Sequence, residues 1–318
     1  MSKRTCVFLS LLTTIVAGCA VPTGTIEDDI GPFVPSVDDE TLVEGDPPLA
    51  PDADDDEVGE TAALTIKGTA PKCPAFTNTL SPKGLTLVLH VSKHPEHAER
   101  EVRHLHDVRR YVRVRDVFMI ERGSPYVRKI REMFPCNRVH FIAYPDEMHD
   151  ALTTGEGVDG IAVDWEGGAV VSHSASWSAV QLHDYTRKIH DQHKTAGFVP
   201  AWSGGFDDAA IARASNMDYE LPQIQGACVN GASHFASASK RLLLNFRAHG
   251  LSVRNVGFEI SLDSFSFAAN HVSADRAAAC TREAYGKGAR AIYIYGNGHD
   301  HLPDYLRALA KMGVRTPR

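Results

Sequence analysis

From residue 83 onward, short apolar runs alternate with longer stretches in which apolar residues recur every three or four positions. The short runs predict eight strands, at Leu85–Val91, Asp116–Glu121, Arg138–Tyr144, Gly160–Trp165, Phe198–Trp202, Tyr219–Gln225, Val256–Ser261 and Ala291–Tyr295. The longer stretches predict helices, at Glu96–Val112, Pro125–Phe134, Glu147–Leu152, Ala179–Lys194, Asp207–Ser215, Ala236–His249, Ala274–Gly286 and Leu302–Met312. Strands that alternate with helices pair in parallel through right-handed crossovers.

Eight strand-and-helix units in about 235 residues predict the α/β class and a single (β/α)8 TIM barrel over residues 71–318. An open doubly wound sheet is the competing interpretation, but no glycine-rich phosphate turn follows the first predicted strand. In a barrel, inward polar residues at the C-terminal strand ends share one mouth. The candidates there are His90, Glu121, Tyr144, Asp164, Glu166, Trp202, Gln223, Gln225, Glu259 and Tyr295.

Residues 1–19 combine a basic start with an apolar segment. Lys3 and Arg4 precede the apolar run Val7–Val16, and small residues then lead to Cys19. This order predicts a secretory signal peptide. Its ending resembles the lipobox of bacterial lipoproteins, which implies that Cys19 is lipidated; an ordinary cleaved signal is the alternative. We therefore expect an exported bacterial lipoprotein of the outer membrane, cell surface or periplasm, held to the membrane by its lipid.

Residues 20–70 are expected to form a disordered acidic linker. Between Ala20 and Glu60 the chain has 14 acidic residues and no Lys or Arg, so the segment repels itself and has little to bury. The remaining chain is nearly balanced in charge and has no dense Lys/Arg block, which argues against nucleic acid as a partner. Beyond the leader, no apolar run reaches the roughly 18 residues that span a membrane.

Four cysteines lie outside the leader, at Cys73, Cys136, Cys228 and Cys280. An even number in an exported protein predicts two disulfides, and three pairings are open. None of the four lies in a C-x-x-C pair or at ligand spacing from a histidine, so we expect no zinc site. The 16 histidines are interpreted as exposed or loop residues, and no metal or other cofactor is expected.

The segment Asp159–Glu166 is the most informative part of the sequence. Side chains alternate along a strand, so Asp164 and Glu166 should face inward with Ala162, while Trp165 faces the helices. Two neighbouring anions repel, which makes the outer carboxyl hold its proton more tightly, as a general acid requires. The alternative is a structural acid pair bound to barrel arginines.

This segment resembles the D-G-x-D-x-D-W-E signature on the fourth strand of glycoside hydrolase family 18, the chitinases and endo-β-N-acetylglucosaminidases. The matching residues are Asp159, Gly160, Asp164, Trp165 and Glu166. The resemblance implies that Glu166 protonates the glycosidic oxygen. It also implies that Asp164 orients the substrate's 2-acetamido group, whose carbonyl oxygen attacks the anomeric carbon. The implied substrate is an N-acetylglucosamine-containing glycan, such as a chitin oligomer, an N-glycan or peptidoglycan.

The sixth predicted strand carries a weaker similarity, to the D-Y-x-x-x-Q-x-Y pattern of the plant-type members, through residues 218–225. Two positions depart from the family. Ala162 replaces the middle Asp of the signature, and Gln225 stands where a Tyr would hold the acetamido carbonyl. A slow hydrolase is compatible with these changes, and so is a non-catalytic carbohydrate-binding lipoprotein on the same barrel.

A second mechanism fits the predicted strand ends. Glu166 and Glu259 reproduce the placement of acid/base and nucleophile in clan-A retaining glycosidases, where the two carboxyls lie about 5–5.5 Å apart.

Three aromatic residues are candidates for contact with sugar rings. By the family 18 resemblance, Tyr295 replaces the Trp that lies beneath the sugar. Trp202 and Tyr144 are expected either to stack on sugar rings or to pack against other side chains. The predicted substrate contacts are Gln225, Gln223, Tyr295, Trp202, Tyr144, Glu259 and Asp159.

Overall fold

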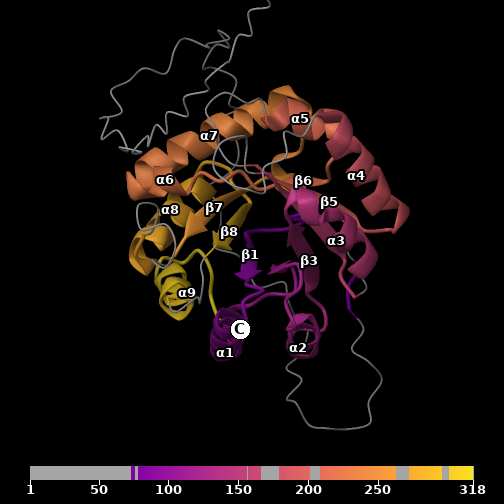
Figure 1. Cartoon of the computed structure of the whole chain (residues 1–318). Coiled ribbons are helices and arrows are strands. Elements are labelled where there is room, and N and C mark those ends of the chain that lie inside the picture. Colours follow the sequence, from indigo (N-terminus) through magenta and orange to yellow (C-terminus); the bar gives the residue numbers. More distant parts are fainter. Residues whose placement is uncertain are drawn as a thin grey trace, which may run out of the picture. The chain divides into compact units, whose positions relative to one another are not determined.

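The computed structural model describes residues 73–75, 78–155, 157–165, 179–200, 208–262, 272–295 and 301–317. The predicted leader, Cys19 and the acidic linker lie outside these residues, as do Glu166 and Trp202. The described part contains eight parallel strands wrapped into a barrel with helices around it (Figure 1). This confirms the predicted α/β (β/α)8 TIM barrel.

The elements follow the predicted order along the chain. The strands are β1 Thr86–Val91, β2 Val117–Glu121, β3 Arg138–Ala143, β4 Gly160–Trp165, β5 Thr195–Pro200, β6 Tyr219–Glu220, β7 Gly257–Ser261 and β8 Ala291–Tyr295. The helices are α1 Pro95–Asp107, α2 Val127–Met133, α3 Met148–Thr154, α4 Ala179–Asp191, α5 Asp208–Ser215, α6 Gln225–Val229, α7 Ala232–Ala248, α8 Ala274–Gly286 and α9 Leu302–Lys311. Short 3₁₀ turns lie at η2 Arg109–Tyr111, η3 Pro145–Glu147 and η4 Val253–Asn255.

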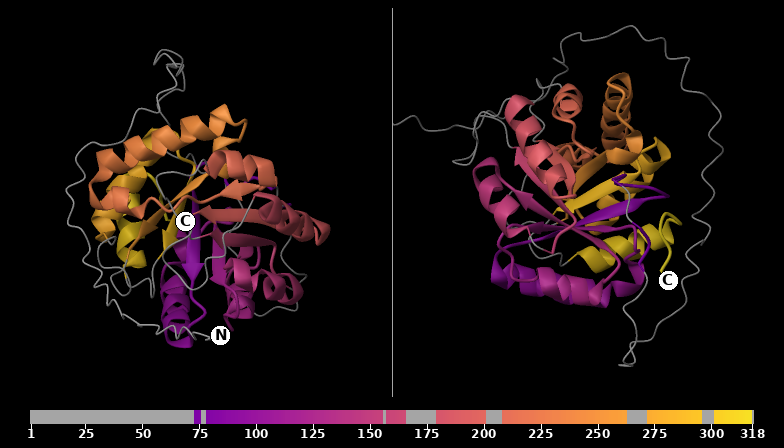
Figure 2. Two further views of the ribbon diagram at one scale, coloured as in Figure 1. Left: turned by 45° about the horizontal axis from the view of Figure 1, so that its top comes forward. Right: turned by 90° about the vertical axis from the view of Figure 1, so that its right-hand side faces the viewer.

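The sheet runs in the order β6-β5-β4-β3-β2-β1-β8-β7. It closes between β6 and β7 through a bridge from Glu220 to Val256 and a hydrogen bond from Glu259 N–H to the Pro222 carbonyl at 3.2 Å. Figure 2 shows the strands fanning about a common axis inside the ring of helices. Because the strands are parallel, their C-terminal ends meet at one end of the barrel, which we call the mouth.

Alternate residues of each strand pack into two separate apolar clusters. On β2, Phe118 and Ile120 face the helices, whereas Val117 and Met119 lie inside the barrel. The period-two alternation of a strand produces this division, because successive side chains point to opposite faces of the sheet. The inward face of each strand can therefore be identified from its cluster.

Two predicted strands differ from the structure by more than one residue at an end. β5 begins at Thr195, three residues before the predicted start at Phe198. The prediction missed these residues because Gly197 is not typical of a strand. A Cβ at Gly197 would come within 2.2 Å of the Tyr219 ring, so the barrel needs glycine there. β6 is limited to Tyr219–Glu220, since Pro222 has no N–H for the ladder. Gln225, predicted as the end of that strand, is instead the first residue of α6.

The end of the barrel opposite the mouth is filled by the segment that enters it. Leu80 is fully buried inside the barrel. The Arg138 guanidinium, at the start of β3, donates to the carbonyls of Thr79 at 2.9 Å and Leu80 at 2.5 Å. A disulfide between Cys73 and Cys136 ties the same segment to the start of β3. This end is therefore packed and crosslinked, and the mouth is the end where chemistry can occur.

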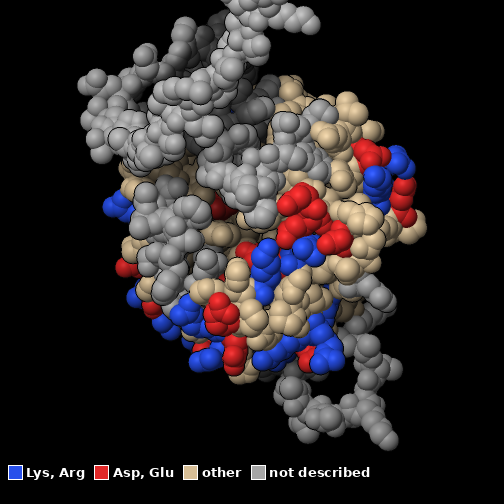
Figure 3. Space-filling view, viewed as in Figure 1, with Lys and Arg blue, Asp and Glu red and all other residues tan. Residues whose placement is uncertain are grey.

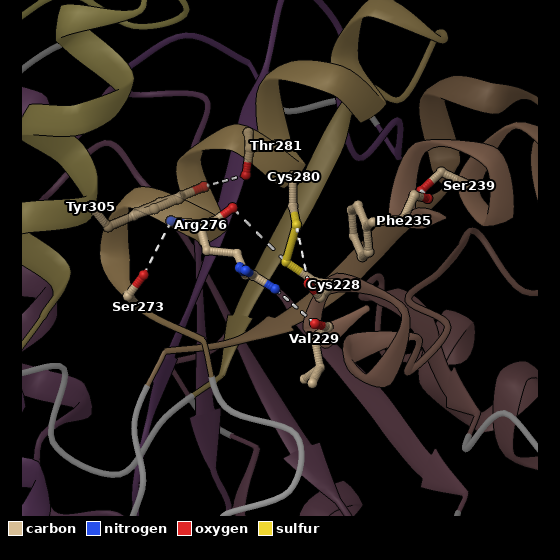
Figure 4. The surroundings of a disulfide bond; sticks show 9 residues. All are labelled: Cys228, Val229, Phe235, Ser239, Ser273, Arg276, Cys280, Thr281 and Tyr305. Carbon is tan, nitrogen blue, oxygen red and sulfur yellow. Dashed lines mark hydrogen bonds between the residues drawn. A yellow bond between two sulfur atoms is a disulfide. The ribbon is translucent and has the colours of Figure 1, made fainter. Parts of the chain in front are cut away.

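The second disulfide joins Cys228 of α6 to Cys280 of α8 (Figure 4). Beside it, the Arg276 guanidinium donates to the Val229 carbonyl at 2.8 Å. This contact and the disulfide fix α6 against α8, and α6 directly follows the mouth segment that contains Gln223. Of the three pairings left open by the sequence, the structure contains this one. Among the described residues, no helix is both long enough and apolar enough to cross a membrane.

Candidate functional site

Asp164 lies at the mouth, near the C-terminal end of β4. Its strand neighbour Ala162 belongs to the cluster inside the barrel, while Ile161, Val163 and Trp165 face the helices. The Trp165 ring packs against Phe198 with the ring centroids 5.6 Å apart. Asp164 therefore faces inward, as the alternation predicts. Glu166 is the next inward position by sequence and lies outside the described residues.

The Asp164 carboxylate is held by the segment that follows β6. The Gln223 amide donates from Nε2 to Asp164 Oδ1 at 3.1 Å. Gln223 itself is positioned by a backbone hydrogen bond from its N–H to the Pro200 carbonyl at 3.0 Å, at the end of β5. These two hydrogen bonds link the ends of three neighbouring strands, β4, β5 and β6. It brings together two predicted site residues that are 59 positions apart in the sequence.

Glu259 also faces the inside of the barrel. Its neighbours Val256, Phe258 and Ile260 belong to the cluster beneath the helices, which leaves Glu259 on the inward face of β7. Glu259 is 3% exposed. A second carboxylate is therefore placed in the barrel interior on the strand that the sequence indicated.

Two tyrosines of β8 lie near these acids. Tyr293 and Tyr295 share the inward face with Ala291. Burial raises the pKa of Tyr293 well above its ordinary value, and the negative charges of Glu259 and Asp164 add to that increase. Burial likewise raises the pKa of Tyr295, with Glu121 the largest charge contribution. Both phenols therefore remain protonated near neutral pH and can act as hydrogen-bond donors.

Tyr293 is a site residue that the sequence analysis did not identify. It is 1% exposed, and its hydroxyl has no hydrogen-bond partner among the described residues. The sequence could have indicated it, because Ala291, Tyr293 and Tyr295 occupy alternate positions of one strand and therefore share one face. A buried polar group without a partner is uncommon and calls for an explanation in terms of function or strain.

On the other side of the mouth, His90 of β1 contacts Glu121 of β2. The distance from His90 Nε2 to Glu121 Oε1 is 3.2 Å. Burial alone would raise the pKa of Glu121. The hydrogen bond and charge of His90, together with the Lys93 backbone N–H and its charge, outweigh burial and lower this pKa to about 2. Glu121 is therefore an anion throughout the physiological range. The His90 ring packs on Tyr295 with centroids 4.6 Å apart.

A set of charged residues continues from this pair across the ends of β1, β2 and β3. Glu147 Oε1 accepts hydrogen bonds from Lys93 Nζ at 3.2 Å and Arg122 Nη2 at 3.1 Å. The other oxygen, Oε2, accepts from the Tyr144 N–H at 3.2 Å. The Lys93 ammonium lies 5.9 Å from the centroid of the Tyr144 ring. We call this set the β1–β3 cluster: His90, Lys93, Glu121, Arg122, Tyr144 and Glu147.

One predicted substrate contact, Asp159, is placed away from this arrangement, and Gln225 is placed on a helix rather than a strand. Asp159 precedes β4 and lies at the barrel end opposite Asp164. Its Oδ2 accepts from Arg131 Nη2 at 2.7 Å and from the Val139 N–H at 2.8 Å, contacts that tie β4 to β3 and α2. Gln225 begins α6 and is partly buried. Among the described residues, no group of three or more His, Cys, Asp or Glu side chains could hold a metal ion.

Comparison with solved structures shows the fold. The GH18 chitinase ChiB of Flavobacterium johnsoniae matches with a TM-score of 0.50 at 10% identity, covering 73% of this chain and 94% of that one. The catalytic domain of psychrophilic chitinase B from Arthrobacter TAD20 matches with a TM-score of 0.50 at 9% identity, covering 76% and 98%.

A barrel enzyme of different chemistry is equally similar. The HMG-CoA lyase of Bacillus subtilis matches with a TM-score of 0.50 at 10% identity, covering 74% of this chain and 89% of that one. No family model matches the sequence, and no curated protein matches it. The structural neighbours therefore include GH18 chitinases and other TIM-barrel enzymes, and they establish the barrel rather than the reaction.

Proposed function

We propose that this protein is a glycoside hydrolase that cleaves an N-acetylglucosamine-containing glycan by substrate-assisted, retaining hydrolysis. The observation that carries the proposal is the position of Asp164. Asp164 lies on the inward face of β4 at the mouth, and its carboxylate is held by Gln223. In the sequence it comes two residues before Glu166, in a segment that resembles the family 18 signature. The barrel that this chain shares with solved GH18 chitinases adds support at the level of fold.

In the proposed reaction, Glu166 gives its proton to the glycosidic oxygen as the bond to the anomeric carbon breaks. The acetamido carbonyl oxygen of the same sugar forms a bond to that carbon, and Asp164 accepts a hydrogen bond from the acetamido N–H. Water then attacks the anomeric carbon, the bond to the acetamido oxygen breaks so that the acetamido group is restored, and water gives a proton to Glu166, which restores the acid and leaves the configuration retained. The Gln223 amide, the described donor to Asp164, holds the carboxylate in the orientation required.

A second mechanism has its own supporting observation. Glu259 and Asp164 are the two charges that most raise the pKa of Tyr293, so both carboxylates lie near the same phenol. In this version Glu259 attacks the anomeric carbon while Glu166 protonates the departing glycosidic oxygen. Water then hydrolyses the covalent glycosyl-enzyme, releasing the Glu259 carboxylate and returning a proton to Glu166. A covalent adduct on Glu259, detected by mass spectrometry after rapid quenching, would favour this version over the acetamido route.

The test is hydrolysis of chitin oligomers, peptidoglycan and N-glycans by the full chain and by Glu166→Gln and Asp164→Asn. We expect hydrolysis by the unmodified chain, a loss of at least about a hundredfold in both variants, and retained glycan binding in Glu166→Gln. Asp184→Asn, which removes an exposed carboxylate on α4, serves as the control. Binding without turnover by the unmodified chain would instead support a carbohydrate-binding protein.

We also propose that the protein is exported and anchored through a lipid on Cys19. The two disulfides support export, because such bonds persist in oxidising compartments. The anchor is tested by metabolic labelling with a fatty acid: the label should be incorporated into the unmodified chain and absent from Cys19→Ser. Equal labelling of both chains would contradict it.

A further inference from the structure

The end of the barrel opposite the mouth, which we call the base, has a surface of positive charge. Four of its loops lead into strands that are neighbours in the sheet, β7, β8, β1 and β2. These loops are residues 249–256, 287–290, 78–85 and 108–116, and all of them lie within the described residues. They carry seven exposed or partly exposed cations, which we call the basic patch: Lys83, Arg109, Arg110, Arg115, Arg254, Lys287 and Arg290.

Carboxylates do little to offset this charge. The one acid in the four described loops is Asp116, which is fully buried in an ion pair. Two arginines of the basic patch are held by neutral backbone carbonyls. Arg254 Nη1 donates to Pro82 at 2.7 Å, and Arg115 Nε donates to Leu85 at 3.0 Å. These bonds fix the two guanidinium groups against the loop before β1 without removing their charge.

The charge at the mouth differs from that at the base. In the β1–β3 cluster the two signs are mixed, and Figure 3 shows Lys/Arg and Asp/Glu side chains adjoining over α3 and the ends of β1 and β3. The interior of the mouth is acidic, since Asp164, Glu121 and Glu259 act there on the tyrosines of β8. At the base, Asp107 at the end of α1 is an exposed acid beside the seven cations of the patch. An acidic ligand is therefore attracted to the base and repelled from the interior of the mouth.

The chain itself contains an acidic segment that is attached at the base. Residues 48–60 include six Asp or Glu and no Lys or Arg. Twelve residues follow, and Cys73 is then joined by a disulfide to Cys136, which precedes β3 at the base. Covalent attachment gives the segment a high local concentration at the basic patch, so attractions that are weak one by one are sufficient for binding.

The connection is long enough for this contact. Twelve extended residues span up to about 40 Å. Neighbouring strands lie about 4.8 Å apart, so the four steps from β3 to β7 cover roughly 19 Å of the barrel wall. We propose that residues 48–60 bind the basic patch, so that the chain leading to the barrel is held against the base. The contact leaves the mouth open to a ligand and does not depend on the reaction performed there.

The experiment treats the full chain with a water-soluble carbodiimide, which joins a carboxylate to an amine that it contacts, and maps the links by mass spectrometry. In about 20 mM NaCl we expect links from residues 48–60 to Lys83 and Lys287. Their yield should fall at least about fivefold in about 1 M NaCl, where the Debye length is about 3 Å. Lys129, which is exposed on α2 towards the mouth, should form no link to this segment.

Two pairs of substitutions test the position of the charge. Arg109→Gln with Arg110→Gln should lower the yield of the Lys287 link in low salt at least about threefold, because two exposed charges of the patch are lost. Arg128→Gln with Arg187→Gln is the matched control, since it removes the same charge from α2 and α4, where these side chains are 91% and 57% exposed. The control should leave the yield unchanged.

Four results would overturn the contact. The first is an absence of links in low salt, and the second is a yield that high salt does not lower; the cations would then serve only the helix ends at the base. An equal loss of yield in the two pairs of variants would mean that net charge, rather than the basic patch, attracts the segment. Links between an isotope-labelled chain and an unlabelled chain would assign the contact to a second copy. None of these results bears on glycan hydrolysis, so the proposed function is tested separately.

Discussion

Replacing Tyr293 by Phe should stabilise the fold, although most changes to a buried residue destabilise. The substitution removes one hydroxyl, which is buried with no protein hydrogen-bond partner among the described residues, and leaves the ring in place. Burying an unsatisfied hydroxyl costs about 1–3 kcal/mol. Tyr293→Phe is therefore expected to raise the free energy of unfolding by about 1 kcal/mol or more. The same change should reduce glycan hydrolysis, since it removes a protonated phenol that lies near both Glu259 and Asp164 and is available to a bound sugar.

Tyr305 offers a matched comparison. It is also fully buried, but its hydroxyl lies 2.9 Å from Thr281 Oγ1. Figure 4 shows the hydrogen bond that joins the two side chains. Tyr305→Phe breaks that bond and leaves the buried Thr281 hydroxyl without its partner, so it should lower the free energy of unfolding by about 1–3 kcal/mol. The two variants remove the same atom from the same residue type and should shift stability in opposite directions.

Urea unfolding with the disulfides intact gives the midpoint and slope for each variant. In thermal unfolding, 1 kcal/mol corresponds to about 2–4 °C for a domain of this size. If Tyr293→Phe loses as much stability as Tyr305→Phe, the Tyr293 hydroxyl is bonded in the folded protein. The functional role inferred for this hydroxyl would then be wrong.

Three other predictions concern single contacts. Glu121→Gln should lower the free energy of unfolding by about 3 kcal/mol near neutral pH, because the folded pKa of Glu121, about 2, lies below its ordinary value of 4.5. In acid titrations, the difference in stability between the unmodified chain and this variant should be complete above about pH 5 and lost as the pH falls towards 2. Gln223→Leu should lower kcat/KM on chitin oligomers by about tenfold or more through the loss of the donor to Asp164, and an unchanged kcat/KM would contradict that role. Replacing Cys228 and Cys280 together by Ala should lower the free energy of unfolding by about 4 kcal/mol, judged from the 52-residue separation, and a non-reducing urea titration measures this.

The sequence was sufficient for the fold and for the orientation of the residues on clearly patterned strands. β4, β7 and β8 lie within or close to their predicted bounds, and each puts its polar residues inward as the alternation requires. Their signal is local, since an inward polar residue between two outward apolar ones is visible in any short window. Asp164 and Glu259 could be found for that reason.

The remainder of the site depends on contacts between distant parts of the chain. The hydrogen bond between Lys93 and Glu147 joins residues 54 positions apart, and no pattern within either segment indicates the other. β5 was misplaced because Gly197, needed for the Tyr219 ring, does not resemble a strand residue. Asp159 matched the family signature, but the structure uses its carboxylate to join β4 to its neighbours at the far end of the barrel.

The stereochemistry of the first product is the sharpest test of a retaining reaction that uses Asp164 and Glu166. Proton NMR of chitotetraose, recorded as hydrolysis by the full chain begins, reports the configuration at the newly formed reducing end before it equilibrates. We expect that the β-configuration of the substrate linkage is retained and that Glu166→Gln forms no product. An α-anomer at the outset, or undiminished cleavage by Glu166→Gln, would contradict the assignment of Asp164 and Glu166 to the reaction.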